Sequence, residues 1–349
     1  DKTLLGLSLL GGTAGTFMVL PFASRIVERL TPRIAAANLL LLIAVVQVIA
    51  FSTSAYWVFL VALMIFGACR TVLEVAQNVI AMQIEADTGI HVVARSHGFW
   101  SIGLLVGALF SGLIGGLSLT LWHHMLLAAG IVLVLVGLLL RIAPRAVTAA
   151  APQQGKLFIL PDRAILLVCA MMFGVAITEG AIYDWSAFYI EQVLQAETAA
   201  VGILFSCFTI GMATTRMVGD WLRAHFPAPN IVRSSVASAA LGLVILLWSP
   251  NLFVAAFGLL LIGAGIALNA PLAMSAAARL GARSPGENLA AMSMVNTFAF
   301  LGVPASLGLV ADLYGLKLAF ALLLLPLLAS FFLAPITGFR PQRTPPIVR

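Results

Sequence analysis

The chain has 349 residues, of which 62% are hydrophobic and 9% are charged, and its mean hydropathy is +1.09. Soluble proteins carry about 25% charged residues, so this composition excludes a water-soluble domain. The net charge of +6 could indicate nucleic-acid binding in a soluble protein. In a membrane protein it has a simpler source, the basic loops of one side, so no nucleic-acid partner is expected.

Many segments are long and apolar enough to cross a bilayer, which takes about 20 residues of α-helix. The sequence therefore predicts an all-α membrane protein with eleven transmembrane helices. In chain order, these segments lie near residues 3–23, 34–53, 56–83, 95–117, 121–141, 164–189, 199–219, 232–249, 252–278, 287–312 and 317–337.

Basic residues alternate from loop to loop, and this alternation predicts the orientation in the membrane. The loop at 24–33, the long connection at 142–163 and the C-terminal tail are rich in Arg and Lys. The loops of the opposite side hold only two lysines or arginines, Lys2 and Lys317. Because positively charged loops stay in the cytoplasm, the C-terminus is predicted to be cytoplasmic.

The long basic connection divides the chain into two similar halves. An offset of 195 residues aligns Gly107 with Gly302, and an offset of 196 aligns Gly67 with Gly263. Two six-helix halves are the architecture of a major class of secondary transporters. We therefore predict an N-terminal half at 1–142, a cytoplasmic central loop at 143–163, a C-terminal half at 164–338 and a cytoplasmic tail at 339–349.

The first span of the second half, 164–189, has no counterpart in the first half, because subtracting the offset gives negative numbers. We predict that the natural protein has twelve helices, that the first half holds helices 2–6 and that the second half holds helices 7–12. A natural protein of eleven helices is the alternative.

Several short stretches point to a known family: Gly67–Asn78, Glu85, Ser96–Phe99, Gly103, Gly107 and Glu179–Ser186. With these stretches the chain resembles the major facilitator superfamily over its whole length and, within it, the bacterial fucose-permease-like branch. The resemblance implies the superfamily fold, a location in the bacterial inner (plasma) membrane and a monomer. Neither a cofactor nor a metal is expected.

A cytoplasmic gate is suggested by a second motif of this superfamily, roughly G-x-x-x-D-R-x-G-R after the second helix. In the first half Ser24 occupies the usual Asp position, so a charge-based gate is in doubt there. The second copy keeps Asp220, and the resemblance implies a gate formed by Asp220 with Arg216 or Arg223. The alternative is that these residues only set the loop topology.

Three polar residues of the third predicted span share one helix face. Arg70, Glu74 and Asn78 follow one another at intervals of four residues, near the middle of the membrane. Unpaired charges are costly there, so the face is predicted to line a substrate or proton pathway. A buried ion pair that holds the helices together is the alternative. In the second half, Glu74 aligns with Asn269, so the charge pair is not repeated.

The seventh helix of the expected twelve holds the other acidic candidates. Burial disfavours a charged carboxylate, so Glu179 is predicted to take up and release protons. Tyr183 lies on the same face and could stack on a ring, whereas Asp184 is nearer the outer end. Asn269 and Asn296 are predicted to complete the substrate and proton pathway.

These features predict a secondary active transporter that works by alternating access, is linked to protons and moves a small polar metabolite such as a sugar. An exporter of amphipathic compounds or drugs is the alternative within transport. A membrane-embedded enzyme is disfavoured, because the loops are short and no nucleophile elbow or metal-ligand cluster is present. The chain has no G-x-x-x-x-G-K-[ST] loop, so direct use of ATP is not expected.

Overall fold

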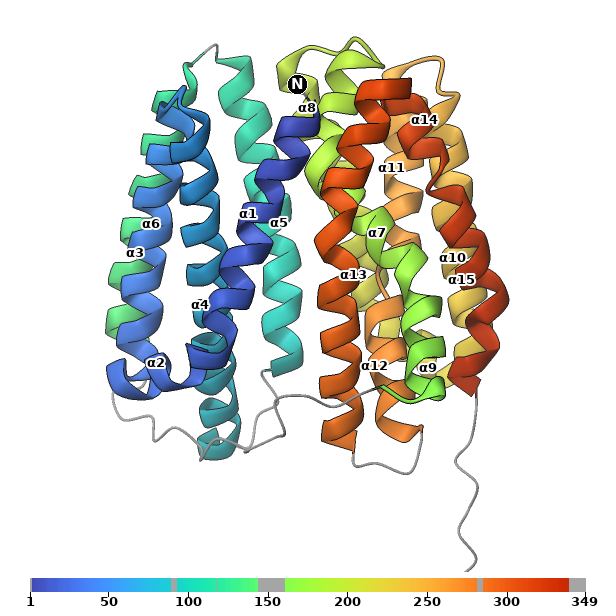
Figure 1. Ribbon diagram of the computed structural model, residues 1–349, viewed down its shortest axis with the longest axis horizontal. Helices are drawn as coiled ribbons and strands as arrows, with labels where there is room; N and C mark the ends of the chain where they lie inside the picture. Colours follow the sequence, from blue (N-terminus) through green and yellow to red (C-terminus); the bar gives the residue numbers. More distant parts are fainter. Residues whose placement is uncertain (1, 89–92, 118, 144–160, 281–284, 339–349) are drawn as a thin grey trace, which may run out of the picture. The chain divides into compact units, whose positions relative to one another are not determined.

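The computed structural model describes residues 2–88, 93–117, 119–143, 161–280 and 285–338 (Figure 1). These residues form α-helices, two 3₁₀ turns and short connections, with no strand among them. The predicted all-α fold is therefore confirmed. Contacts divide the chain into two compact units, the first with residues 1–153 and 304–312 and the second with residues 154–303 and 313–349.

The transmembrane segments follow the sequence prediction. Ten helical segments of the described chain are long and apolar enough to cross a membrane, and they match ten of the eleven predicted spans. The remaining predicted span, 287–312, lies within the 30-residue helix α13, Pro285–Tyr314.

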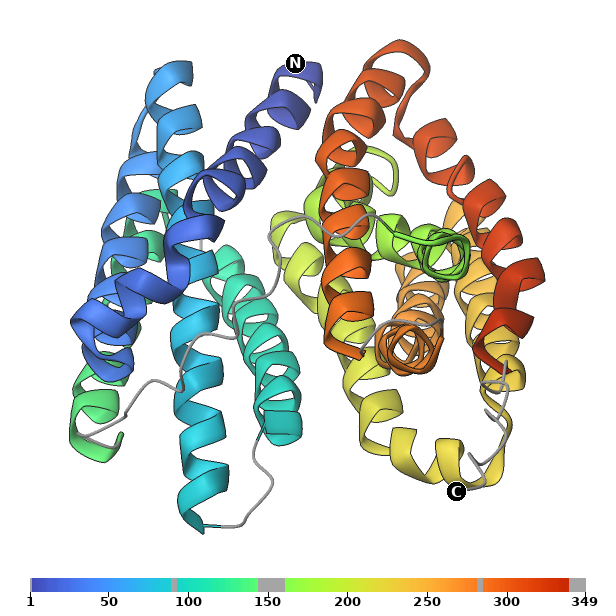
Figure 2. The same ribbon diagram turned by 60° about the horizontal axis from the view of Figure 1, so that its bottom comes forward.

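Helix α4 is the centre of the first unit. It packs against α1 on one side and α3 on another, and α3 also packs against α6 (Figures 1 and 2). The helices of this unit are α1 (Lys2–Val19), α2 (Ala23–Leu30), α3 (Pro32–Ser52), α4 (Tyr56–Thr88), α5 (Val93–Gly116) and α6 (Leu121–Ile142), with a 3₁₀ turn at Leu20–Phe22.

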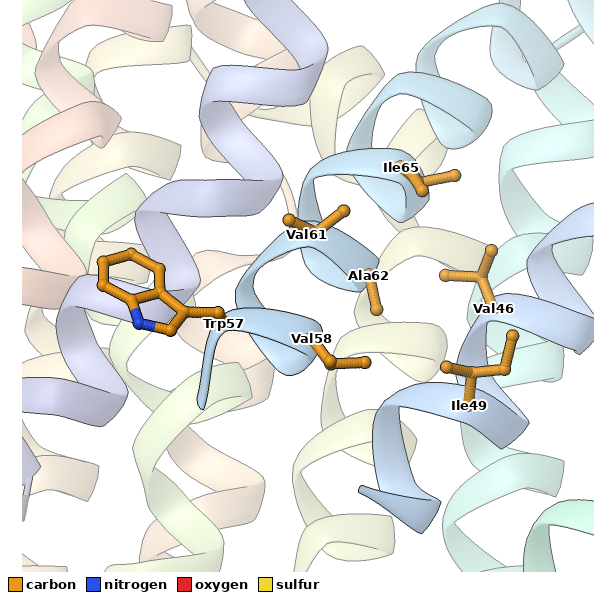
Figure 3. Close-up of a pocket in the computed structure, with 7 residues that line it drawn as sticks. All are labelled: Val46, Ile49, Trp57, Val58, Val61, Ala62 and Ile65. Carbon is orange, nitrogen blue, oxygen red and sulfur yellow. The ribbon is translucent and has the colours of Figure 1, made fainter. Parts of the chain in front are cut away.

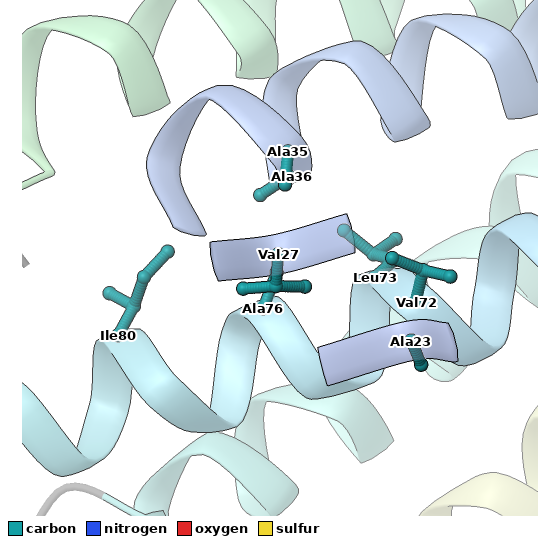
Figure 4. Close-up of a cluster of buried hydrophobic side chains, with 8 residues drawn as sticks. All are labelled: Ala23, Val27, Ala35, Ala36, Val72, Leu73, Ala76 and Ile80. Carbon is teal, nitrogen blue, oxygen red and sulfur yellow. The ribbon is translucent and has the colours of Figure 1, made fainter. Parts of the chain in front are cut away.

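The short helix α2 runs across the end of α3 rather than along it (Figure 1). Ala23 and Val27 are one turn apart and nearly fully buried, so they form the apolar face of α2. That face packs on α4 and on the first turns of α3 (Figure 4). The cluster consists of Ala23, Val27, Ala35, Ala36, Val72, Leu73, Ala76 and Ile80.

In the second unit, α7 packs against α15, and α11 packs between α8 and α10. Asp162 and Asn251 cap α7 and α11 by accepting hydrogen bonds from Ile165 N and Val254 N. The helices are α7 (Arg163–Gln192), α8 (Thr198–Met217), α9 (Gly219–His225), α10 (Ala228–Leu247), α11 (Leu252–Ile266), α12 (Asn269–Arg279), α13 apart from its residues 304–312, α14 (Leu316–Ala321) and α15 (Leu324–Leu333), followed by a 3₁₀ turn at Ala334–Gly338.

Glycines let α1 and α4 approach each other closely in the first unit. A Cβ atom added at Gly15 would lie 1.8 Å from the Met64 carbonyl oxygen, and one added at Gly67 would lie 1.9 Å from the Gly12 carbonyl oxygen. Neither position can accept a side chain without a backbone shift. Small residues at such crossings are how membrane helices pack without a hydrophobic driving force.

The same contact recurs in the second unit, displaced by 196 residues. Gly211 packs against the Leu260 carbonyl and Gly263 against the Phe208 carbonyl, where an added Cβ atom would lie 2.1 and 1.9 Å from the oxygens. These four residues, on α8 and α11, correspond to four residues of the α1–α4 contact: Phe208 to Gly12, Gly211 to Gly15, Leu260 to Met64 and Gly263 to Gly67. The internal repeat therefore extends to individual backbone contacts, and its offset at this crossing is 196.

Gly67→Ala is expected to destabilise the first unit, because the new methyl group would overlap the Gly12 carbonyl. Overpacking of this kind costs about 1–3 kcal/mol. Gly130→Ala on α6 is a matched control, because a Cβ atom there meets nothing within 4 Å. Thermal unfolding in detergent, followed by tryptophan fluorescence, should show a lower Tm for the first variant. Equal Tm values would contradict the close contact.

Candidate functional site

A polar cluster joins α7 and α8 within the second unit. The Tyr183 hydroxyl donates a hydrogen bond to Glu179 Oε1 at 3.1 Å and lies 3.7 Å from the Met212 sulfur. Arg216 Nη2 lies 4.0 Å from the same Glu179 oxygen, and the Arg216 and Glu179 side chains are 26% and 25% exposed. A charged pair inside two predicted spans thus remains partly accessible.

The spacing of these residues explains how the two helices present them. Glu179 and Tyr183 are one turn apart on α7, and Met212 and Arg216 are one turn apart on α8. Met212 meets Tyr183 while Arg216 meets Glu179, so the two pairs run in opposite directions, as in neighbouring antiparallel helices. Two residues four apart share a helix face, so each helix contributes both residues from one face.

Two phenylalanine rings of α8 contact the Tyr183 ring. The Tyr183 ring centroid lies 6.1 Å from that of Phe205 and 5.7 Å from that of Phe208, the latter with an edge-to-face angle of 89°. Phe208 is fully buried, whereas Tyr183 and Phe205 are half-buried. The rings hold Tyr183 in place and leave part of an aromatic surface beside the Glu179–Arg216 pair.

A break in the helix that follows α10 gives Arg216 a second partner. Helix α11 ends at Ile266 and α12 begins at Asn269. Pro271 has no N–H group, so the carbonyl of Ala267, four residues earlier, cannot receive its usual helical hydrogen bond. Arg216 Nε donates to this oxygen at 3.4 Å. Arg216 therefore connects the Glu179 carboxylate on α7 to the break between α11 and α12.

Tyr183→Phe is expected to weaken this cluster, because it removes the hydrogen bond to Glu179 and keeps the ring contacts. Hydrogen bonds to charged groups contribute about 1.5–3 kcal/mol, and partial exposure places this one near the lower end. Tyr314→Phe, at an exposed position, is the control. Thermal unfolding of both purified variants tests the effect. An unchanged Tm for Tyr183→Phe would exclude a stabilising role of the hydroxyl.

Arg216 was predicted to belong to a cytoplasmic gate and Glu179 to a proton pathway, and the structure brings the two side chains together. One feature of the sequence could have indicated this pairing. Arg216 is the one charged residue of α8, and a lone charged residue inside a membrane needs a partner of opposite charge. The predicted gate partner Arg223 is exposed on α9. The Asp220 side chain lies outside the described residues.

The polar face predicted on α4 is present, and it extends to one more residue. Arg70, Glu74 and Gln77 are exposed, whereas Asn78 is half-buried. Among the described residues no ion pair joins Arg70 to Glu74, so the alternative of a buried ion pair is not what the structure shows. The adjacent Thr71 instead links α4 to α1, because its hydroxyl lies within hydrogen-bond distance, 3.0 Å, of the Thr16 hydroxyl on α1 and donates at 2.9 Å to Gly67 O of its own helix.

The other predicted residues of the second unit lie on α7, α12 and α13. Asn269 is fully buried and donates a hydrogen bond to the Gly265 carbonyl at 2.8 Å. Gly265 itself packs against Ala239 of α10, so this hydrogen bond connects the first residue of α12 to the last turn of α11 where it meets α10. Asp184 is half-buried on α7. Asn296 belongs to α13, but its side chain lies outside the described residues.

A pocket of about 350 Å³ in the first unit has a different character. It opens beside α3 and α4 (Figure 3). Without a charged or hydrogen-bonding side chain beyond one indole, it could not select a polar solute. Its lining residues are Val46, Ile49, Trp57, Val58, Val61, Ala62 and Ile65. In the described part of the chain, no His, Cys, Asp and Glu side chains gather as a metal site.

Comparison with known proteins identifies the fold and the family. The family model of the Major Facilitator Superfamily matches residues 1–304. An uncharacterised MFS-type transporter of Yersinia pestis is 27% identical over 277 residues, which are 77% of this chain and 71% of that protein.

Two solved transporters have a similar structure. The nucleoside transporter NupG has a TM-score of 0.73 at 15% identity, with 97% of this chain and 91% of that chain covered. The fucose:proton symporter FucP of E. coli has a TM-score of 0.57 at 16% identity, with 97% and 98% covered. At these identities the two structures show the fold alone. Because the family model covers most of the sequence, this multi-pass membrane protein belongs to the Major Facilitator Superfamily.

Proposed function

We propose that the protein is a secondary active transporter that uses alternating access and a proton gradient to move a small polar metabolite. The observation that carries this proposal is the Glu179–Arg216 pair, whose oppositely charged side chains lie 4.0 Å apart within predicted spans and are each about one-quarter exposed. Ionisable residues inside a membrane are costly, and they commonly mark substrate and proton pathways.

In this proposal Glu179 carries the proton. Its carboxylate is stabilised by the Arg216 guanidinium and the Tyr183 hydroxyl. When Glu179 is protonated, the attraction to Arg216 is lost, and Arg216 keeps its hydrogen bond to Ala267 O. A proton taken up from one side therefore changes the charge of the site, and release to the other side restores it.

The proposed substrate is a neutral ring compound with several hydroxyl groups, such as a sugar or a nucleoside. The paired charges of Glu179 and Arg216 cancel, so the cluster does not favour a strongly charged solute. The half-buried Tyr183 and Phe205 rings offer a surface for stacking. The names of the two structural neighbours, a nucleoside transporter and a fucose:proton symporter, support the same class.

We further propose that the exposed polar face of α4 contributes to the pathway through Arg70, Glu74 and Asn78, and that Asn296 belongs to it. Asp184, Asn269 and the gate residues Asp220 and Arg223 remain predictions. The proposed setting is a bacterial inner membrane with the C-terminus in the cytoplasm. The protein is proposed to act as a monomer, without a cofactor.

A ligand screen tests this function. The purified protein is heated with sugars, nucleosides, organic acids, amino acids or lipophilic cations, and unfolding is followed by fluorescence. A ligand present at about 100 times its Kd adds roughly 2.7 kcal/mol to the stability. We expect a sugar or nucleoside to stabilise the protein, with the effect lost in Arg70→Ala and weakened in Glu179→Gln, which keeps the shape of the site. Stabilisation by lipophilic cations alone, unchanged in both variants, would favour an exporter of amphipathic compounds.

A further inference from the structure

Arginines gather where α2, the start of α3 and the end of α6 meet in the first unit. Arg25 and Arg29 are exposed on α2, Arg33 is half-buried in the first turn of α3, and Arg141 is exposed at the end of α6. Two contacts show that these three ends converge. Arg33 Nη2 donates a hydrogen bond to the Leu140 carbonyl, and the side chain beside it, Leu139, packs on the cluster of Figure 4.

Helix α2 turns its arginines away from the protein. Its buried residues Ala23 and Val27 face α4. Arg25 and Arg29 each follow one of them by two positions, which is about 200° around the helix, so both arginines lie on the opposite face. Glu28, the acidic residue of this helix, is about 100° from Val27 on a flank. The outer face is therefore positively charged.

Exposed apolar side chains border the arginines. Leu30 of α2, Ile34 of α3 and Ile142 of α6 are exposed, Ile142 to 78%. Phe22, at the start of α2, is exposed as well. A free inorganic anion would need only the positive charge. A molecule with a negative head and hydrocarbon chains would use both the arginines and the apolar rim.

We propose that this junction of α2, α3 and α6 binds the headgroup of an anionic phospholipid. Arg25, Arg29 and Arg141 contact the phosphate and glycerol oxygens, while the acyl chains lie along the apolar rim. Basic pockets between membrane helices bind anionic headgroups in this way, and amphipathic helices with basic polar faces lie at the lipid interface. Arg33 supports the site from behind by holding the end of α6 against α3.

The test uses the purified full chain in detergent, titrated with dioleoylphosphatidylglycerol and followed by native mass spectrometry. The triple variant Arg25→Gln, Arg29→Gln and Arg141→Gln removes the charges and leaves Arg33 in place. Each arginine near a lipid surface contributes about 1 kcal/mol, so we expect roughly 100-fold weaker binding of this lipid. Dioleoylphosphatidylcholine, which has the same chains and no net charge, should bind both proteins equally weakly.

A matched control removes three exposed arginines of the second unit, by Arg163→Gln, Arg223→Gln and Arg279→Gln. Wild-type affinity for phosphatidylglycerol in this control supports the proposal. An equal loss in both triple variants would overturn it, because charge in general would then explain the binding. The proposal would also be overturned if the wild type bound phosphatidylcholine as tightly as phosphatidylglycerol, or if inorganic phosphate displaced the phosphatidylglycerol. Unfolding curves of the three proteins verify that they are folded.

Discussion

Glu179→Gln is expected to abolish accumulation of the substrate against its gradient. A pH gradient of one unit stores about 1.4 kcal/mol per proton, which supports roughly tenfold accumulation of a neutral solute carried with one proton. A glutamine keeps the shape of Glu179 and a carbonyl oxygen for Tyr183 and Arg216, but it cannot bind a proton at physiological pH. Accumulation should fall to the external concentration, while exchange of labelled for unlabelled substrate continues.

Uptake into proteoliposomes with an imposed pH gradient measures this effect, with the compound that the ligand screen identifies. Glu191→Gln is the matched control, because Glu191 is an exposed acid in the last turn of the same helix. It should accumulate substrate like the wild type. If Glu179→Gln also does so, another group carries the proton.

The fold was largely predictable from the sequence, because hydrophobic spans have a strong and local signal. Ten of the predicted spans coincide with described helices. The repeat was also visible, although the structure gives an offset of 196 at the glycine crossings, where Gly15 corresponds to Gly211 and Gly67 to Gly263. Glycines that touch a neighbouring backbone keep their register, so they define the offset better than Gly107, where an added Cβ atom would meet nothing within 4 Å.

The candidate site was only partly predictable. The i, i+4 spacing identified Glu179 with Tyr183, because both lie on one helix. It could not identify Arg216 as a partner, since contacts between helices depend on how each helix is rotated. The sequence treated 252–278 as one span, and the structure shows a break between Ile266 and Asn269. The effect of Pro271 depends on whether another donor reaches the Ala267 carbonyl, and that donor, Arg216, comes from a different helix.

The second large effect is expected for Arg216→Gln. This change leaves the Glu179 carboxylate without its cation and removes the Nε donor to the Ala267 carbonyl. A buried ion pair that loses one partner costs about 3–5 kcal/mol, and the partial exposure of this pair reduces the electrostatic part. An unsatisfied carbonyl adds about 1–3 kcal/mol. A total near 3 kcal/mol is expected in thermal unfolding.

Two second-site changes separate these contributions. Glu179→Gln in the Arg216→Gln background removes the unpaired charge and should restore the electrostatic part. Pro271→Ala in the same background supplies an N–H group four residues after Ala267, which can complete the helical hydrogen bond and should restore the backbone part. Pro304→Ala, at a proline inside α13, is the control and should restore neither. If Pro271→Ala gives no more recovery than Pro304→Ala, Arg216 does not stabilise the protein through the Ala267 carbonyl, and the break between α11 and α12 does not depend on it.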